Sequence, residues 1–232
     1  MSHEKQTAIA IDGPAGAGKS TIAKLVAKEL GFIYVDTGAM YRAMAIHFLG
    51  KGITLEAAKE MNDESAGAIG NACEDAEVSI RFEDGVQHVY LNGQDVTGGL
   101  RTQEVGDMAS ATSVLKAVRT RLVALQQNLA AKTPVVMDGR DIGTVVLPDA
   151  KLKIYLTASV EERASRRFKE LSEKGETPVM DEIVEEIRER DHRDTTRAES
   201  PLRKADDAVE VDTSDLTIPE VTARILDLWK NC

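Results

Sequence analysis

The chain of 232 residues has only two cysteines, Cys73 and Cys232, and they are far apart. This separation excludes a zinc-finger spacing and predicts two free thiols in a reducing compartment. The four histidines are scattered, without the spacing of metal ligands. Long apolar runs are also missing, because the longest stretches, 7–11 and 134–137, are far below the ~18 residues of a membrane-spanning helix. We therefore expect no membrane partner.

The chain also lacks an excess of positive charge. Its 29 Lys and Arg residues stand against 39 Asp and Glu residues, which gives a formal net charge of −10. A sequence-independent nucleic-acid binder needs a basic face for phosphates, so we expect no nucleic-acid partner. Any polyanion must bind to a local cluster of cations. Residues 1–7 are polar and lack the apolar region of a secretory signal, which predicts a cytoplasmic protein.

Short apolar runs alternate with segments of helical spacing along most of the chain. This alternation predicts an α/β fold with a central parallel sheet flanked by helices. We expect one domain over 1–232. The predicted strands are 7–11, 32–35, 135–137, 152–156 and 208–211, and the predicted helices are 20–30, 39–49, 55–72, 160–174, 180–197 and 219–230.

One segment has a different periodicity. Residues 78–82 and 88–92 alternate apolar and polar side chains, with the turn signals Glu83-Asp84-Gly85 and Asn92-Gly93 at their ends. This pattern predicts a small antiparallel insertion at about 77–98. Helical spacing returns after Gly98-Gly99 and continues to about residue 131.

The strongest local motif lies at 13–20 and matches G-x-x-x-x-G-K-[ST], the pattern of a phosphate-binding loop (P-loop). Its glycines let backbone N–H groups surround a phosphate, Lys19 supplies a charge for the β- and γ-phosphates, and the Ser20 hydroxyl can ligate Mg²⁺. A strand precedes the motif and a helix follows it, which argues against a chance match. The predicted ATP-binding residues of this loop are Gly13, Pro14, Ala15, Gly16, Ala17, Gly18, Lys19, Ser20 and Thr21.

A P-loop alone does not define a reaction. The chain has no N-K-x-D tetrapeptide for guanine and is short for a motor. What remains is mostly small-molecule kinases, which also need a site for the phosphoryl acceptor.

Two segments follow strands at the sheet edge where open α/β folds bind ligands. In the first, 36–42, Thr37 is a possible helix cap beside an anion site, although a plain strand-to-helix turn explains the segment too. In the second, 138–143, Asp138 resembles a carboxylate of the Mg²⁺ shell but serves equally well as a helix cap. Arg140 can bind a phosphate bidentately and Asp141 can accept from an exocyclic amine, whereas the alternative is a salt-bridged turn.

Two further segments are rich in arginine. If 187–197 is helical, Arg190, Asp194 and Arg197 lie at i, i+4 and i+7 and share one face. A solvated helix with internal ion pairs is the alternative. The residues Arg163, Arg166 and Arg167 precede a loop with Gly175 and form either a cationic flap over the donor phosphates or another solvated helix.

Five segments occur together in an order that resembles bacterial cytidylate kinases over nearly the whole chain. They are IDGPAGAGKST at 11–21, DTGAMYR at 36–42, LRTQEVGDMAS at 100–110, DGRDIGTVVLPDA at 138–150 and ERDHRDTTRAESPL at 189–202. The fourth and fifth segments are specific to that family among P-loop kinases. The resemblance implies a P-loop kinase with Mg²⁺ and ATP, an antiparallel insertion within a monophosphate-binding region at 38–110, and a short lid at 163–178.

The resemblance also implies roles for individual residues. The CMP phosphate would be held by Thr37, Tyr41, Arg42 and Arg140, where the family often has Ser in place of Thr37. The cytosine edge would be read by Ser110, Arg119, Asp141 and Arg197, and the ribose hydroxyls would be held by Arg190 and Asp194. Of the lid arginines, Arg163 and Arg166 would contact ATP. The catalytic cations would be Lys19, Arg42, Arg140 and Arg167.

The sequence thus predicts phosphorylation of CMP and dCMP by ATP, with ATP, CMP and dCMP as partners of a monomer. Two alternatives stay open. One is a P-loop kinase for UMP or another small acceptor, which would differ in the residues that read the base. The other is a nucleotide-dependent regulatory module that hydrolyses ATP slowly and is indifferent to CMP.

Overall fold

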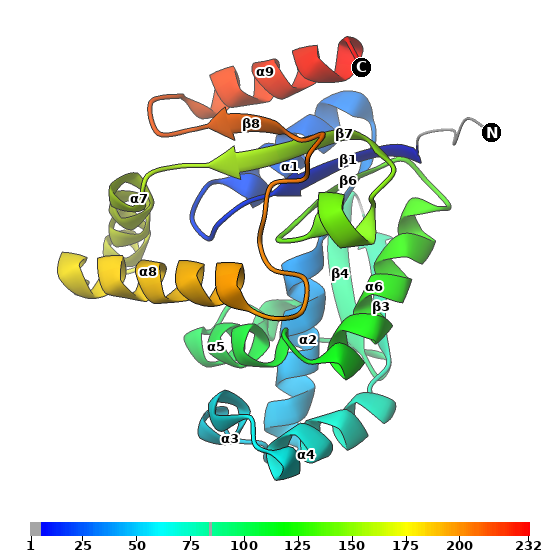
Figure 1. The fold of residues 1–232 in the computed structure, drawn as a ribbon, viewed down its shortest axis with the longest axis vertical. Helices are drawn as coiled ribbons and strands as arrows, with labels where there is room; N and C mark the ends of the chain where they lie inside the picture. The colour runs from blue at the N-terminus through cyan, green and yellow to red at the C-terminus, as the bar shows by residue number, and fades with distance from the viewer. Residues whose placement is uncertain (1–5, 84) are drawn as a thin grey trace. The chain divides into compact units, whose positions relative to one another are not determined.

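The computed structural model describes residues 6–83 and 85–232 (Figure 1). The polar N-terminal residues up to Lys5, with His3, and Asp84 of the predicted turn lie outside the described residues. The chain divides into two compact units. The first consists of residues 1–34 and 133–232, and the second of residues 35–132.

The first unit is built on a five-stranded sheet with the order β2-β6-β1-β7-β8, in which the last two residues of β2 already belong to the second unit. Strand β1 pairs in parallel with β6 and β7, and β7 pairs in parallel with β8. All five predicted strands are present, which confirms the predicted α/β class. Their bounds are β1 Gln6–Asp12, β2 Ile33–Asp36, β6 Val135–Gly139, β7 Ala150–Thr157 and β8 Val209–Asp212.

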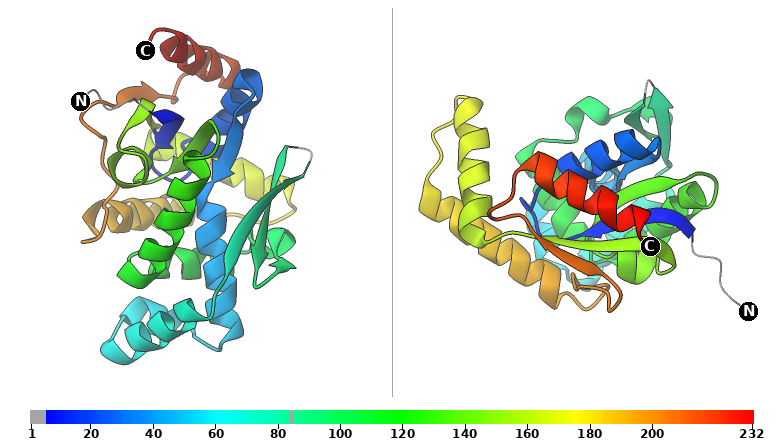
Figure 2. Two further views of the ribbon diagram at one scale, coloured as in Figure 1. Left: turned by 90° about the vertical axis from the view of Figure 1, so that its right-hand side faces the viewer. Right: turned by 90° about the horizontal axis from the view of Figure 1, so that it is seen from above.

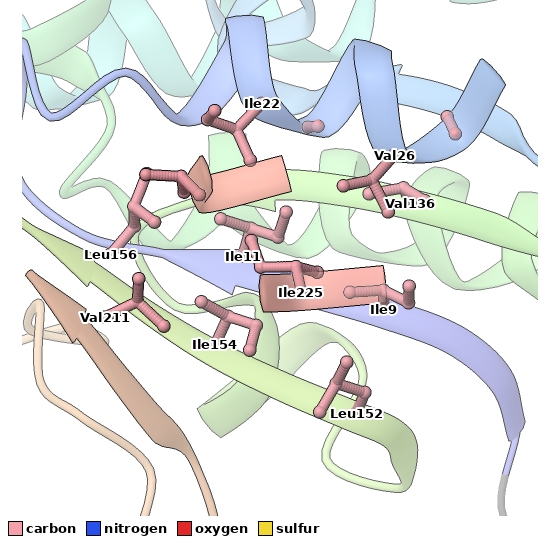
Figure 3. Packing of buried hydrophobic residues seen from close by; sticks show 13 residues of the cluster. Ile9, Ile11, Ile22, Val26, Val136, Leu152, Ile154, Leu156, Val211 and Ile225 are labelled. Carbon is pink, nitrogen blue, oxygen red and sulfur yellow. The ribbon is translucent and has the colours of Figure 1, made fainter. Parts of the chain in front are cut away.

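Helices α1 (Lys19–Leu30) and α9 (Ile218–Lys230) contribute apolar side chains to the sheet's main core. Figure 3 shows Ile22 and Val26 of α1 facing Ile11 and Val136 of the strands. Helix α1 ends at Gly31, which adopts the left-handed conformation with φ 66°. Helix α9 begins with a capping box and with proline in its first turn.

Helices α7 (Val160–Glu173) and α8 (Met180–Thr196) pack against each other in the same unit (Figure 2). The predicted helix 180–197 is one residue too long, because Arg197 has ψ 141° and leaves the helix. Arg197 therefore does not continue the helix face of Arg190 and Asp194. The sequence pattern also did not predict η2 (Ile142–Val146), a short π-helix between β6 and β7.

The second unit combines helices with a three-stranded antiparallel sheet of order β3-β4-β5. The sheet confirms the predicted antiparallel insertion. Asn92 and Gly93 have φ values of 49° and 80° and form the two-residue turn between β4 and β5. The elements are α2 Thr37–Gly50, α3 Leu55–Glu60, α4 Asp63–Glu74, β3 Val78–Glu83, β4 Val86–Leu91, β5 Gln94–Asp95, η1 Thr97–Gly99, α5 Gln103–Thr112 and α6 Lys116–Ala130.

Two predictions for this unit were wrong in detail. The segment 55–72 forms two helices, because Met61 takes a left-handed φ of 48° and Asn62 caps α4 by accepting from the Ser65 N–H at 2.9 Å. The cap of α2 is Asp36 and not Thr37. The Asp36 carboxylate accepts from the Ala39 N–H at 3.0 Å, while Thr37 is the first helical residue.

Both cysteines are free thiols, as the sequence predicted, and Cys73 is buried whereas Cys232 is exposed. Within residues 6–83 and 85–232, every helix is too short or too polar to cross a membrane.

The central strand is expected to dominate the stability of the first unit. Ile11 is fully buried in β1, so Ile11→Ala should lower the free energy of unfolding by about 2–5 kcal/mol in urea titrations. Leu25 on α1 is 37% exposed, and Leu25→Ala should cost less than about 1 kcal/mol. Equal losses for the two variants would contradict the placement of this core.

Candidate active site

The chain passes from β1 into the P-loop through a position that only glycine can occupy. Gly13 has φ 150°, and a Cβ there would lie 1.9 Å from the backbone carbonyl oxygen of Leu156 in β7. Gly18 ends the loop in the left-handed region, with φ 88°, directly before α1. Gly13 and Gly18 therefore let the loop enter the first turn of α1 without a Cβ at either position, and the free amides of such a helix start can bind an anion.

Lys19, the first residue of α1, is buried within this loop. Its Nζ donates to the Pro14 carbonyl oxygen at 2.6 Å, and its side chain is 6% exposed. Burial lowers the pKa of Lys19 well below its usual value, and the cations Arg140 and Arg190 lower it further, whereas Asp138 and Asp194 oppose the shift. A phosphate entering the loop would favour the charged lysine.

The sequence left open whether Asp138 belongs to a Mg²⁺ site or caps a helix. In the structure it lies directly beside the P-loop serine. Its Oδ2 accepts from the Ser20 hydroxyl at 2.9 Å and its Oδ1 from the Tyr34 hydroxyl at 3.0 Å. A hydroxyl and a carboxylate are the oxygen ligands that Mg²⁺ prefers, and this ion keeps waters and phosphate oxygens as its other ligands. Ser20 and Asp138 therefore fit a magnesium ion bound together with a nucleotide.

Arg140 and Asp194 form the next ion pair, which is largely buried. The Arg140 Nε donates to Asp194 Oδ2 at 2.7 Å, and their side chains are 19% and 9% exposed. Burial acts to raise the pKa of Asp194, but Arg140, Arg190 and Arg197 outweigh it and hold that pKa below its usual value. Asp141, next in the chain, lies 3.8 Å from the guanidinium of Arg197. The first unit thus brings Arg140, Asp141, Asp194 and Arg197 together.

The predicted lid arginines differ in their surroundings. Arg163 is buried and donates to the P-loop carbonyl of Ala15 at 3.1 Å and to both carboxylate oxygens of Asp191. Arg166 donates to Glu162 and to Thr213 on the loop after β8. Arg167 pairs with Glu170 one turn further along α7. Of the hydrogen bonds and ion pairs named here, the bond from Arg163 to the Ala15 carbonyl is the one made to the P-loop itself.

In the second unit, four predicted residues lie around the start of α2, namely Thr37, Tyr41, Arg42 and Arg119. The Arg119 guanidinium donates to the Tyr41 hydroxyl at 3.3 Å, and Thr37 is buried in the first turn. A Cβ on Gly38 would lie 3.2 Å from Nη1 of Arg42, so the absence of a side chain there leaves room for this guanidinium. Ser110 lies in α5, half-buried.

The sequence did not indicate two residues, Gln87 and Asp12, whose side chains bond the backbone next to the predicted site residues. Gln87 of β4 bonds both backbone groups of Asp36, accepting from its N–H at 2.9 Å and donating to its carbonyl at 3.2 Å. No local pattern signals that contact. Asp12 accepts from the N–H groups of Ile142 and Gly143 at 2.7 Å each. Its position could have indicated a role, because Asp12 ends β1 directly before the P-loop.

Burial raises the pKa of Asp12 to about 6, although its bonds to the Gly143 and Ile142 N–H groups and the charge of Lys19 oppose the rise. An acid with a raised pKa destabilises the folded protein once it ionises. The free energy of unfolding of the wild type, relative to Asp12→Asn, should therefore fall by roughly 2 kcal/mol between about pH 4.5 and about pH 7.5. Urea titrations at both pH values measure this difference, and a difference independent of pH would contradict it.

The chain is similar to known proteins over nearly its whole length. Residues 9–231 match the family model of cytidylate kinase. The chain is 51% identical over 222 residues to a cytidylate kinase of Streptococcus sanguinis, with 95% of each chain covered.

A cytidylate kinase of Bacillus licheniformis is 49% identical over 227 residues, which cover 97% of this chain and 96% of the relative. A solved structure of an uncharacterized protein from Eubacterium ventriosum shares the fold, with a TM-score of 0.52 at 13% identity, over 98% of this chain and 100% of that one. The family match and the full-length identity give one conclusion: the chain belongs to the cytidylate kinase family.

Proposed function

We propose that this protein transfers the γ-phosphoryl group of ATP to CMP and dCMP, giving ADP with CDP or dCDP. The observation that carries the proposal is the family match over residues 9–231, together with a P-loop whose lysine and serine stand beside buried carboxylates. Phosphoryl transfer depends more on positioning and charge neutralisation than on covalent chemistry. The P-loop would position the triphosphate, and Lys19 and Arg140 would neutralise charge.

The donor triphosphate would bind to the P-loop, with Lys19 at its β- and γ-phosphates. Ser20 and Asp138 would hold Mg²⁺, which supplies charge neutralisation when bound to the triphosphate. In this proposal Arg166 and Arg167 contribute charge to the donor side. Arg163 would act there through Ala15 of the loop, because its guanidinium already bonds that carbonyl.

The acceptor needs no general base. An oxygen of the CMP phosphate is already anionic, so it can form the new bond to the γ-phosphorus while the bond to the β–γ bridging oxygen breaks. The proposal assigns the CMP phosphate to Thr37, Tyr41 and Arg42 of the second unit and to Arg140 of the first. Arg42, Arg140 and Arg167 would join Lys19 in neutralising the charge of the transition state.

The base edge distinguishes cytosine from uracil. Cytosine presents an amine where uracil presents a carbonyl oxygen, so the Asp141 carboxylate would accept from the first and repel the second. We assign the rest of the base edge to Ser110, Arg119 and Arg197, and the sugar hydroxyls to Arg190 and Asp194. The use of dCMP and the monomeric state remain predictions of the sequence.

The direct test is a coupled assay of ADP release with ATP, Mg²⁺ and one acceptor at a time. Turnover should be fast with CMP and dCMP, slow with UMP, and near zero with AMP, GMP or no acceptor. Equal turnover with every acceptor would favour a regulatory ATPase. Selective turnover with UMP would move the protein to the alternative acceptor.

The role of Asp141 has its own test. Replacing a carboxylate that bonds the cytosine amine should cost about 1–3 kcal/mol of discrimination. Asp141→Ala should therefore lower the ratio of kcat/KM for CMP to that for UMP by about fivefold or more, while the KM for ATP changes little. An unchanged ratio would remove Asp141 from the base site.

A further inference from the structure

Asp12 holds the backbone of the turn that follows Asp141. It is the last residue of β1 and is 5% exposed. Its Oδ1 accepts from the Ile142 N–H and its Oδ2 from the Gly143 N–H, both at 2.7 Å. A carboxylate bonded to two successive N–H groups fixes both peptide planes, and these planes are the first after Asp141.

The turn needs such an acceptor. In η2 the Asp141 carbonyl oxygen accepts from the N–H groups of Val145 and Val146, at 2.9 and 3.2 Å. The first N–H groups of a helix have no acceptor within it. Asp12 supplies the acceptors from the neighbouring strand, in a place too buried for water to do so easily.

The turn is confined on its other side by Lys153 of β7. A Cβ on Gly143 would lie 3.2 Å from Cδ and 3.3 Å from Cγ of Lys153, and 3.4 Å from Oδ2 of Asp12. The Lys153 side chain is 7% exposed, and its Nζ pairs with Asp207 at 2.8 Å. Gly143 therefore fits closely between the Lys153 stem and the Asp12 carboxylate, and a methyl group there would require the lysine stem to shift by a few tenths of an ångström.

We propose that Asp12 is a positioning residue for acceptor selection: its two hydrogen bonds hold residues 141–143 so that the Asp141 carboxylate meets the cytosine amine. The inference rests on the role proposed above for Asp141. Asp141 is 5% exposed, the backbone after it is held by Asp12, and its carboxylate lies 3.8 Å from the Arg197 guanidinium. With a pKa of about 6, Asp12 is mostly ionised at neutral pH, which strengthens both bonds.

The test uses Asp12→Asn in the full chain. The asparagine keeps the volume but turns an NH₂ donor toward one of the two N–H groups. Loss of a charge-assisted hydrogen bond predicts an about tenfold rise in the KM for CMP and an about fivefold fall in the preference for CMP over UMP. The KM for ATP should stay within about twofold, since Asp12 acts on the acceptor side.

A second variant changes the same turn at Gly143, a residue outside the P-loop. Gly143→Ala should press on the Lys153 stem, strain the turn and shift acceptor selection in the same direction as Asp12→Asn. The matched control is Lys153→Met, which keeps an apolar stem beside Gly143 and removes the ion pair with Asp207. We expect its KM for CMP to equal that of the wild type.

Hydrogen–deuterium exchange tests the two hydrogen bonds to Asp12 without an activity measurement. The amides of Ile142 and Gly143 should be protected in the wild type and exchange faster in Asp12→Asn. Faster exchange with unchanged acceptor selection in both variants would overturn the inference. An equal rise in the KM values for ATP and CMP would overturn it too, by showing that Asp12 acts through the P-loop. A wild type without preference for CMP would instead refute the proposed function.

Discussion

Cations can be buried next to one another only if carboxylates lie among them, and this constraint organises the first unit. Lys19 lies near Arg140 and Arg190, and their charges together with burial lower its pKa. Asp138 and Asp194 oppose that shift and keep the cluster close to neutrality. In a chain of net charge −10, such pairing lets several cations be held close together where the proposed nucleotides would bind.

Ion pairs also connect the P-loop and the end of β6 to helix α8. Arg163 joins the Ala15 carbonyl of the P-loop to Asp191 of α8, and Arg140 after β6 joins Asp194 one turn further along that helix. A substrate phosphate that draws an arginine away from its carboxylate would therefore also change the contact between loop and helix.

Much of the fold could be predicted from the sequence because strands and helices carry local signals. The apolar run before Gly13 and the helical spacing after Gly18 are sufficient for β1, the P-loop and α1. The break at Met61 could not be predicted, because a left-handed methionine has no pattern of its own. The π-helix η2 depends on acceptors from Asp12, 130 residues away, so its cause is tertiary.

The candidate site was predictable to a similar extent. Motifs indicated Lys19, Ser20 and Arg140, since their chemistry is tied to neighbours in the sequence. The helical spacing misjudged Arg197, which leaves α8 and donates to the Ser200 carbonyl oxygen instead. Its side chain nevertheless lies near Asp141, because the turn after the helix directs it there. The bonds of Gln87 to Asp36 join residues 51 positions apart, and only the structure reveals them.

The central claim is that this site directs the γ-phosphoryl group of ATP to a cytosine monophosphate and rejects uracil. The most direct measurement is a competition in one vessel, with ATP labelled at the γ-phosphorus and equal concentrations of CMP and UMP. The account predicts that the label appears in CDP at least about tenfold more than in UDP, with little inorganic phosphate. Equal labelling of the two diphosphates, or label mainly in inorganic phosphate, would contradict it.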